Sequence, residues 1–367
     1  MSDMRMQRLA ALLVQYSIDV QPGEWVVVSG DTVALPLLRA IFREVLEAGG
    51  NPTPLFGDET MARDFFRIAS DDQLKWVNPL QEMVFNQVTG FINVRATTNT
   101  RAMTGIDPKR MQLNAIARQP MMQTYMRRAS EGIFKWSLTQ YPTEASAQEA
   151  NMSLEEYEDF VYSATFCDQD DPVTRWRELS AMQAQKIDWL AGKDRVVLKG
   201  PNIDLSLSIK DRSFINADGS RNMPDGEIFT GPVEDSVNGW VRFTYPSIVN
   251  GRAVSGIELT FKDGKVVEAS AEQNEDLLFA QLDTDSGSRY LGEFAIGTNF
   301  GINRFTGNIL FDEKIGGSIH MAIGASYPDT GGKNQSAVHW DMICDMRDDS
   351  EIHVDGDLFY KDGKFIV

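Results

Sequence analysis

The chain has 367 residues, 42% of them hydrophobic and 24% charged, which is typical of a globular protein of about two domains. Its formal net charge of −18 argues against a nucleic-acid partner and against an anionic membrane surface, because both require a basic face. No apolar run approaches the roughly 20 residues of a membrane span, and the N-terminus lacks the pattern of a signal peptide. We therefore expect a protein with neither a nucleic-acid partner nor a membrane partner.

The first third of the chain alternates between short β-rich runs and helical periodicity. An amphipathic helix is expected at the start, followed by a strand at residues 25–28, a helix that ends at Gly49-Gly50, and a second strand at residues 53–56. A strand–helix–strand order with this spacing predicts a parallel sheet. Further elements are expected in the same domain, namely a strand at 89–96 and helices at 108–128, 153–164 and 171–190. Neither the glycine-rich dinucleotide fingerprint nor a P-loop is present, which disfavours nucleotide binding.

After about residue 192 the sequence becomes rich in β-branched and aromatic residues that alternate with polar ones. Asp-Gly pairs at Asp263-Gly264 and Asp362-Gly363 are typical of tight hairpin turns. We therefore predict an α/β fold in which an N-terminal open parallel-sheet domain (1–192) precedes a β-rich α+β C-terminal domain (193–367).

All three histidines lie late in the chain, at His320, His339 and His353. The run from Ala337 to Cys344 has the character of a strand, so His339 and Asp341 would project from one face. Such a pair can share a divalent metal or form a structural hydrogen bond, and the two interpretations are equally good on these residues alone. On their own, His320 is expected to be a core histidine and His353 to lie at the surface of a terminal hairpin.

The two cysteines, Cys167 and Cys344, form no disulfide framework and are expected to be reduced and buried, although Cys344 is near enough to His339 in sequence to support a site.

A series of ordered segments resembles the M29 family of metallo-aminopeptidases, which includes aminopeptidases T and S. The resemblance is dense from about residue 222 to the end of the chain and rests on residues 222–230, 261–265, 271–272, 291–295, 311–314, 317–324, 327 and 334–341. One departure from the family pattern is Gly231, where an alanine is expected before Pro232. The resemblance implies that the C-terminal domain carries a metal site, and further implies a cytoplasmic homodimer that acts on short peptides in an enclosed cavity.

Residue by residue, the resemblance implies that two divalent ions are bound by Glu227, Glu293, His320, His339 and Asp341. Glu293 would bridge the ions, and Tyr327 would lie beside them. Carboxylates and imidazoles are suited to zinc, cobalt or manganese, and the absence of HExxH excludes the helical zinc-protease arrangement.

The hypothesis that follows is a metal-dependent aminopeptidase that removes the N-terminal residue from short peptides by means of a two-metal-activated water. Tyr327 is the candidate hydrogen-bond donor to the developing oxyanion, and Glu227 or Glu293 is the candidate proton shuttle. A solvated or structural role is favoured for Asp312, Glu313 and Lys314, whereas Lys333 and Asn334 could line a substrate cleft. The alternative is a non-catalytic metal- or peptide-binding protein on the same scaffold. A phosphohydrolase is disfavoured by the acidic balance, and a serine hydrolase by the lack of GxSxG.

Overall fold

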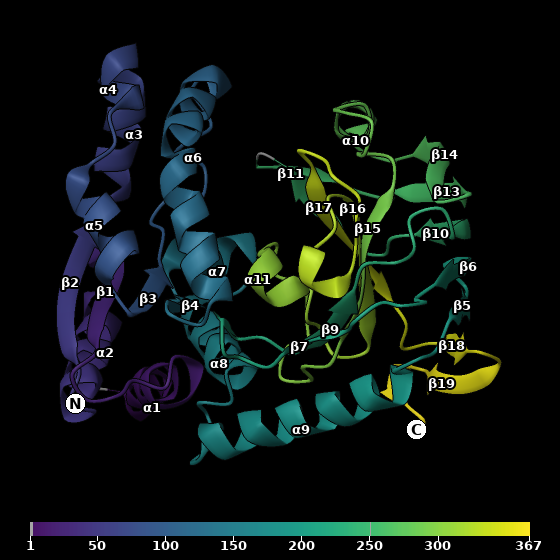
Figure 1. The fold of residues 1–367 in the computed structure, drawn as a ribbon, viewed down its shortest axis with the longest axis horizontal. Helices are drawn as coiled ribbons and strands as arrows, with labels where there is room; N and C mark the ends of the chain where they lie inside the picture. Colours follow the sequence, from purple (N-terminus) through teal and green to yellow (C-terminus); the bar gives the residue numbers. More distant parts are fainter. Residues whose placement is uncertain (1–2, 250) are drawn as a thin grey trace. The chain divides into compact units, whose positions relative to one another are not determined.

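The computed structural model describes residues 3–249 and 251–367, which form two compact units (Figure 1). The first comprises the described residues up to Arg175 together with Gly219–Pro224, and the second comprises Trp176–Asp218 and Asp225–Val367. These units differ from the predicted division after residue 192 because the last long helix, α9 (Pro172–Leu190), lies almost wholly in the second unit. No helix within the described ranges is long and apolar enough to cross a membrane.

The first unit contains the predicted open parallel sheet, with strand order β2-β1-β3-β4-β8 and parallel pairing throughout. Its strands are β1 (Trp25–Asp31), β2 (Asn51–Gly57), β3 (Gly90–Arg95), β4 (Lys135–Gln140) and β8 (Asn222–Met223). The strand β1 lies inside the sheet because Val26, Val27 and Val28 are all buried and β-branched.

Helices accompany this sheet along the chain (Figure 1). They are α1 (Met4–Leu12), α2 (Leu35–Glu47), α3 (Glu59–Ile68), α4 (Asp71–Lys75), α5 (Pro79–Gln87), α6 (Pro108–Ser130), α7 (Glu144–Glu149) and α8 (Leu154–Ala164). The predicted helices correspond to α1, α2, α6, α8 and α9, whereas α3, α4, α5, α7 and strand β4 were not predicted. Helix α2 shows the rule that made it predictable, since Leu37, Leu38, Ile41 and Val45 recur on one face and are buried.

The second unit is a sandwich of two antiparallel sheets with few helices, which confirms the predicted β-rich character. The larger sheet has the order β14-β13-β10-β6-β5-β18-β19-β20, and the smaller has the order β17-β16-β15-β9-β7. The larger sheet is built from β5 (Arg195–Gly200), β6 (Ile203–Ser208), β10 (Asn238–Arg242), β13 (Glu258–Lys262), β14 (Lys265–Ser270), β18 (Glu351–Val354), β19 (Asp357–Lys361) and β20 (Lys364–Phe365). Both predicted Asp-Gly turns have positive φ at the two residues, as hairpin turns of this kind require.

The smaller sheet carries the candidate site. Its strands are β7 (Ile215–Ala217), β9 (Glu227–Thr230), β15 (Leu291–Gly297), β16 (Ser318–Gly324) and β17 (His339–Asp345). A separate hairpin, β11 (Ser247–Val249) with β12 (Arg252–Val254), and two short helices, α10 (Glu275–Leu282) and α11 (Ile309–Asp312), complete the unit.

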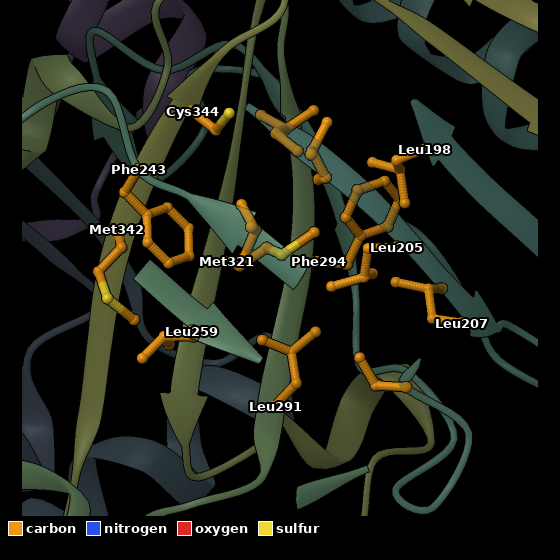
Figure 2. Packing of buried hydrophobic residues seen from close by; sticks show 14 of the residues in the cluster. Leu198, Leu205, Leu207, Phe243, Leu259, Leu291, Phe294, Met321, Met342 and Cys344 are labelled. Carbon is orange, nitrogen blue, oxygen red and sulfur yellow. The ribbon is translucent and has the colours of Figure 1, made fainter. Parts of the chain in front are cut away.

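The two faces of the smaller sheet differ in chemistry because side chains alternate along each strand. One face contributes Phe294, Met321, Met342 and Cys344 to the core, where they pack with Leu198, Leu205 and Leu259 of the larger sheet (Figure 2). The opposite face of the same strands carries the carboxylates and imidazoles of the candidate site. Burial of the apolar face therefore fixes the register, and the register fixes which polar residues meet.

Candidate metal centre

The five predicted ligands come together on four neighbouring strands of the smaller sheet. Each faces an alanine or glycine on an adjacent strand, since the register pairs Glu227 with Gly297, Glu293 with Ala322, His320 with Ala295, His339 with Gly324 and Asp341 with Ala322. Directly opposed residues lie on the same face of a sheet. The small partners leave room above the sheet for the longer ligand side chains to converge.

The converging atoms form two groups that share one carboxylate. The His320 Nε2 atom lies 3.3 Å from Glu227 Oε2 and 3.3 Å from Glu293 Oε1. The His339 Nε2 atom lies 3.2 Å from Glu293 Oε2 and 3.6 Å from Asp341 Oδ1. Within each group the candidate ligand atoms lie within 4.8 Å of one another. Glu293 therefore presents one oxygen to each group.

Backbone carbonyls orient both imidazoles. His320 Nδ1 donates to the carbonyl of Glu313 at 2.8 Å, and His339 Nδ1 donates to the carbonyl of Ala325 at 2.8 Å. With Nδ1 carrying the proton in each ring, Nε2 is the nitrogen that faces the carboxylates. This arrangement is the one by which proteins fix the tautomer and orientation of metal-ligating histidines.

The pKa values reflect burial and the close packing of charges. Burial raises the pKa of Glu227 to about 8, although Lys314 and His320 oppose the shift. Burial would also raise the pKa of Glu293, but hydrogen bonds with His320 and His339 outweigh it and hold this pKa well below its usual value. Burial alone would lower the pKa of the two imidazoles, yet the surrounding carboxylates raise them to about 10 for His320 and about 9 for His339. The Nε2 protons of the two imidazolium rings thus occupy the positions that a divalent cation would take.

The residues present fit a bound divalent cation. The Glu227 Oε2 atom is buried and, among residues 3–249 and 251–367, accepts no hydrogen bond. A buried carboxylate oxygen without a hydrogen bond is costly, and coordination to a cation is one way to satisfy it. The donor set of carboxylate oxygens and neutral imidazole nitrogens suits zinc, cobalt or manganese.

Two further residues join the site, although the sequence favoured a solvated or structural role for them. Glu313 forms a third group of candidate ligand atoms with His320 and Asp341. Lys314 is fully buried, with Nζ in contact with the Glu313 carboxylate and 3.9 Å from Glu227 Oε1. The only signal of these positions in the sequence was the resemblance of residues 311–314 to the family pattern, since nothing in their local spacing indicates burial.

Tyr327 lies at the edge of the site and remains partly exposed, at 46%. Its ring packs edge-on against the His339 ring at a centroid distance of 5.0 Å and contacts Phe229 at 5.4 Å. Partial burial, followed by the nearby carboxylates, raises its pKa above the usual value, so the phenol keeps its proton at neutral pH. The group is therefore available as a hydrogen-bond donor.

The glycine at position 231, which departs from the family pattern, has a structural reason. A Cβ added there would lie 2.2 Å from Ser326 Oγ and 2.9 Å from Thr330 Oγ1. In this chain the alanine expected at that position would collide with the loop that carries Tyr327.

The remaining candidates lie outside the cluster. Cys344 is buried in the core on the opposite face of β17 from His339, so it does not support the site. His353 lies on β18, which forms a hairpin with β19 in the larger sheet, and its side chain is 33% exposed with Nε2 3.0 Å from Glu351. Asn334 donates hydrogen bonds to the carbonyls of Gly287 at 2.9 Å and Gly324 at 2.5 Å, and these bonds hold the loop before β17 in place.

Comparison with known proteins agrees with this geometry. The family model for the thermophilic metalloproteases (M29) matches residues 2–365. Aminopeptidase 2 of Geobacillus stearothermophilus is 31% identical over 98% of this chain and 95% of its own length, and aminopeptidase T of Thermus thermophilus is 26% identical over 98% and 95%.

Solved structures extend the comparison to the fold. The structure of wild-type AmpT from Thermus thermophilus superposes with a TM-score of 0.86 at 21% identity, covering 99% of each chain. A 2,5-dihydroxypyridine dioxygenase from Pseudomonas putida KT2440 shares the fold at a TM-score of 0.58 and 11% identity, covering 99% of this chain and 97% of its own. One fold thus hosts different chemistries, so function has to be argued from the site. The family match over nearly the whole chain shows that the protein belongs to the thermophilic metalloprotease family, M29, and is a peptide hydrolase.

Proposed function

We propose that this protein, a metal-dependent aminopeptidase, releases the N-terminal residue of short peptides at a site for two divalent ions. The observation that carries the proposal is the pair of carboxylate–imidazole groups that share Glu293. The first group, with Glu227 and His320, and the second, with His339 and Asp341, would each hold one ion of the zinc, cobalt or manganese type. When bound, such ions polarise the scissile carbonyl and make a water nucleophilic near neutral pH.

The side chains of the chain itself would perform the remaining tasks. The buried carboxylates give the site a negative field that attracts the amino group of a free N-terminus. Glu227, Glu293 or Glu313 would carry a proton from the attacking water to the leaving amine, because each is close to the reacting region. Lys314 would limit the repulsion among these carboxylates.

Tyr327 would donate a hydrogen bond to the oxygen on which negative charge develops. Replacement of Tyr327 by phenylalanine removes the donor and keeps the ring that packs on His339. We expect Tyr327→Phe to lower kcat by about 100-fold, as loss of a single oxyanion donor does in other hydrolases. Metal content, measured by elemental analysis, should be unchanged; loss of metal together with activity would make Tyr327 a scaffold residue instead.

The experiment that tests the function is metal removal and restoration with a short peptide. Protein treated with a chelator should release no N-terminal residue from Leu-Ala-Ala, and zinc, cobalt or manganese should restore release. An N-acetylated form of the same peptide should stay intact, because it lacks the free amine, and His339→Ala should be inactive with every metal. A correctly folded protein that binds metal but cleaves no peptide would instead be a metal- or peptide-binding protein on this scaffold.

The family resemblance also leads us to propose a cytoplasmic homodimer. Size determination by light scattering is the direct check of the oligomeric state.

A further inference from the structure

A cavity of about 180 Å³ opens next to the metal centre within the second unit. Its lining includes His339, Asp341 and Ile343, which alternate along β17 and therefore share the face on which the candidate ligands project. Two of the proposed ligands thus form part of the cavity wall. The cavity begins at the reacting region rather than at a distance from it.

Two segments of the chain complete the walls. The first segment contributes Pro246 and, from β11 itself, Ile248. The second contributes Phe305 and Ile309, the first residue of α11. The first segment is tied to the edge of β17, since the Ser247 hydroxyl donates to the carbonyl of Asp341 at 2.7 Å.

Another contact on the same edge fixes this segment further. The Thr244 amide donates to the carbonyl of Ile343 at 3.0 Å. Tyr245 then stacks on Phe305 at a centroid distance of 5.4 Å and an interplanar angle of 9°, which links the two segments. The cavity is therefore framed by hydrogen bonds and ring stacking and is not a gap left by a loose loop.

The exposed surface of the cavity is more apolar than polar. Ile248 and Ile309 are each 43% exposed, although both are large aliphatic residues that proteins usually bury. Asp312 also belongs to the lining but is only 1% exposed. Its Oδ1 atom accepts hydrogen bonds from the amide and hydroxyl of Thr306 at 2.7 and 2.9 Å. Apart from His339 and Asp341, which face the metal centre, and the buried Asp312, the lining therefore offers aliphatic and aromatic surface.

We propose that this cavity receives the side chain of the N-terminal residue of the substrate and selects aliphatic side chains of about four non-hydrogen atoms, such as leucine and methionine. The proposal rests on the proposed aminopeptidase function. The α-amine and the scissile carbonyl flank one carbon atom, so the side chain on that carbon leaves the substrate at the reacting centre. The side chain of the second residue begins two bonds beyond the carbonyl, which fits a cavity lined by ligand residues less well.

The size of the cavity sets the preference. At the roughly 30 Å³ that a water molecule occupies in the liquid, the cavity holds about six non-hydrogen atoms. Leucine and methionine side chains have four such atoms and fit, whereas the tryptophan side chain has ten and does not. Beyond His339 and Asp341, which the bound ions would engage, lysine and aspartate side chains would lose hydration without gaining a charged partner in the lining.

The test compares dipeptides that differ only in the first residue with dipeptides that differ only in the second. With Leu-Ala as the reference, kcat/KM should be at least about tenfold lower for Ala-Ala, Trp-Ala, Lys-Ala and Asp-Ala. A series Leu-Ala, Leu-Leu and Leu-Lys should vary much less. Free leucine should also bind the metal-loaded protein more tightly than free aspartate or lysine in calorimetry.

A charge added to the cavity wall makes the test specific to this cavity. Ile248→Glu should raise kcat/KM for Lys-Ala relative to Leu-Ala by at least about tenfold. Val267→Glu is the matched control, because Val267 is an exposed aliphatic residue on β14 that is outside the cavity lining. The control adds the same charge to the same unit and should leave the ratio unchanged.

The outcomes separate the two proposals. Cleavage of all first-residue series at similar rates, or a ratio that shifts equally in Ile248→Glu and Val267→Glu, would overturn the cavity assignment while leaving the aminopeptidase intact. Strong dependence on the second residue with none on the first would also overturn it. Absence of cleavage of every dipeptide in the metal-loaded protein would instead refute the function on which the assignment depends.

Discussion

Lys314 places a full positive charge in the interior, beside the carboxylates of the candidate site. Its side chain is 0% exposed, with Nζ against Glu313 and 3.9 Å from Glu227. Removing one partner of a buried ion pair is far more costly than replacing the whole pair, because it leaves an uncompensated charge. The neutral thioether side chain of methionine fills much of the same space.

We therefore expect Lys314→Met to lower the free energy of unfolding of the metal-free protein by about 3 kcal/mol. Addition of zinc should recover part of the loss, since a bound cation supplies positive charge to the same carboxylates. Lys361→Met is the control, because Lys361 pairs with Glu351 at 2.8 Å on the surface and its loss should leave stability nearly unchanged. Urea unfolding with and without zinc measures the free energy of unfolding of both variants. Equal losses in Lys314→Met and Lys361→Met would contradict the stabilising role of the buried Lys314 charge.

Asp312 should make the free energy of unfolding depend on pH. Burial raises its pKa to about 7, although hydrogen bonds with Thr306 oppose the shift. The folded state then keeps a proton that the unfolded chain loses near pH 4, so stability falls as pH rises through that window. Asp312→Asn keeps an oxygen that can accept from Thr306 and cannot ionise. The stability gained by Asp312→Asn should therefore grow between pH 4 and 7, by up to about 4 kcal/mol.

Urea unfolding of both proteins at intervals of pH, in the presence of a chelator, gives this difference directly. The stability difference should level off above the pKa of Asp312 in the folded protein, because Asp312 is then ionised in the folded and the unfolded state alike. A difference that is constant from pH 5 to 8 would show that Asp312 does not titrate in this range.

At the scale of the strand pair, the site depends on close contact between β16 and the chain that enters β17. Gly324 has φ +98°, and a Cβ added there would lie 2.1 Å from the carbonyl oxygen of Val338, the residue before His339. A backbone atom cannot move aside as a side chain can. Gly324→Ala should therefore push the start of β17 away from β16 and displace His339, which pairs with Gly324.

We expect Gly324→Ala to destabilise the protein by at least about 2 kcal/mol and to lower its metal content. Gly356→Ala isolates the cost of positive φ, since Gly356 has φ +94° and a Cβ there would meet no heavy atom of the described chain within 4 Å. That control should lose only about 1 kcal/mol and keep its metal. Thermal unfolding and elemental analysis give the stability and the metal content of both variants. Equal losses of stability in Gly324→Ala and Gly356→Ala would show that the contact with Val338 is not the cause.

At the scale of the whole molecule, the elements that could be predicted are those whose burial follows a simple period. Helix α2 follows the 3.6-residue period because one of its faces is buried. Strand β1 reads as a continuous apolar run because both of its faces are buried. Helix α3 was not predicted although Met61, Phe65 and Ile68 recur at helical spacing, and none of its residues is buried, so in this helix the apolar period does not mark a packed face. The β8 strand joins the first sheet from residues 222 and 223, and such a return of the chain is invisible to local sequence analysis.

The candidate site shows the same division. His339 and Asp341 could be placed on one face from their spacing alone, because the period of a strand is two. Their meeting with Glu227, Glu293 and His320 depends on the register of three strand pairs, which local spacing does not contain and only the family resemblance suggested. The burial of Lys314 and the approach of Glu313 depend on the tertiary path of the segment before β16.

If the smaller sheet holds two ions that share Glu293, the number of bound ions per chain is the most direct evidence. Chelated protein would be dialysed against zinc, and zinc per chain would be measured by elemental analysis for the wild type, Asp341→Asn and Glu293→Gln. We predict two ions per chain in the wild type, one in Asp341→Asn, and none or one weakly held ion in Glu293→Gln. A single ion in the wild type that survives Glu293→Gln unchanged would contradict a shared two-ion site.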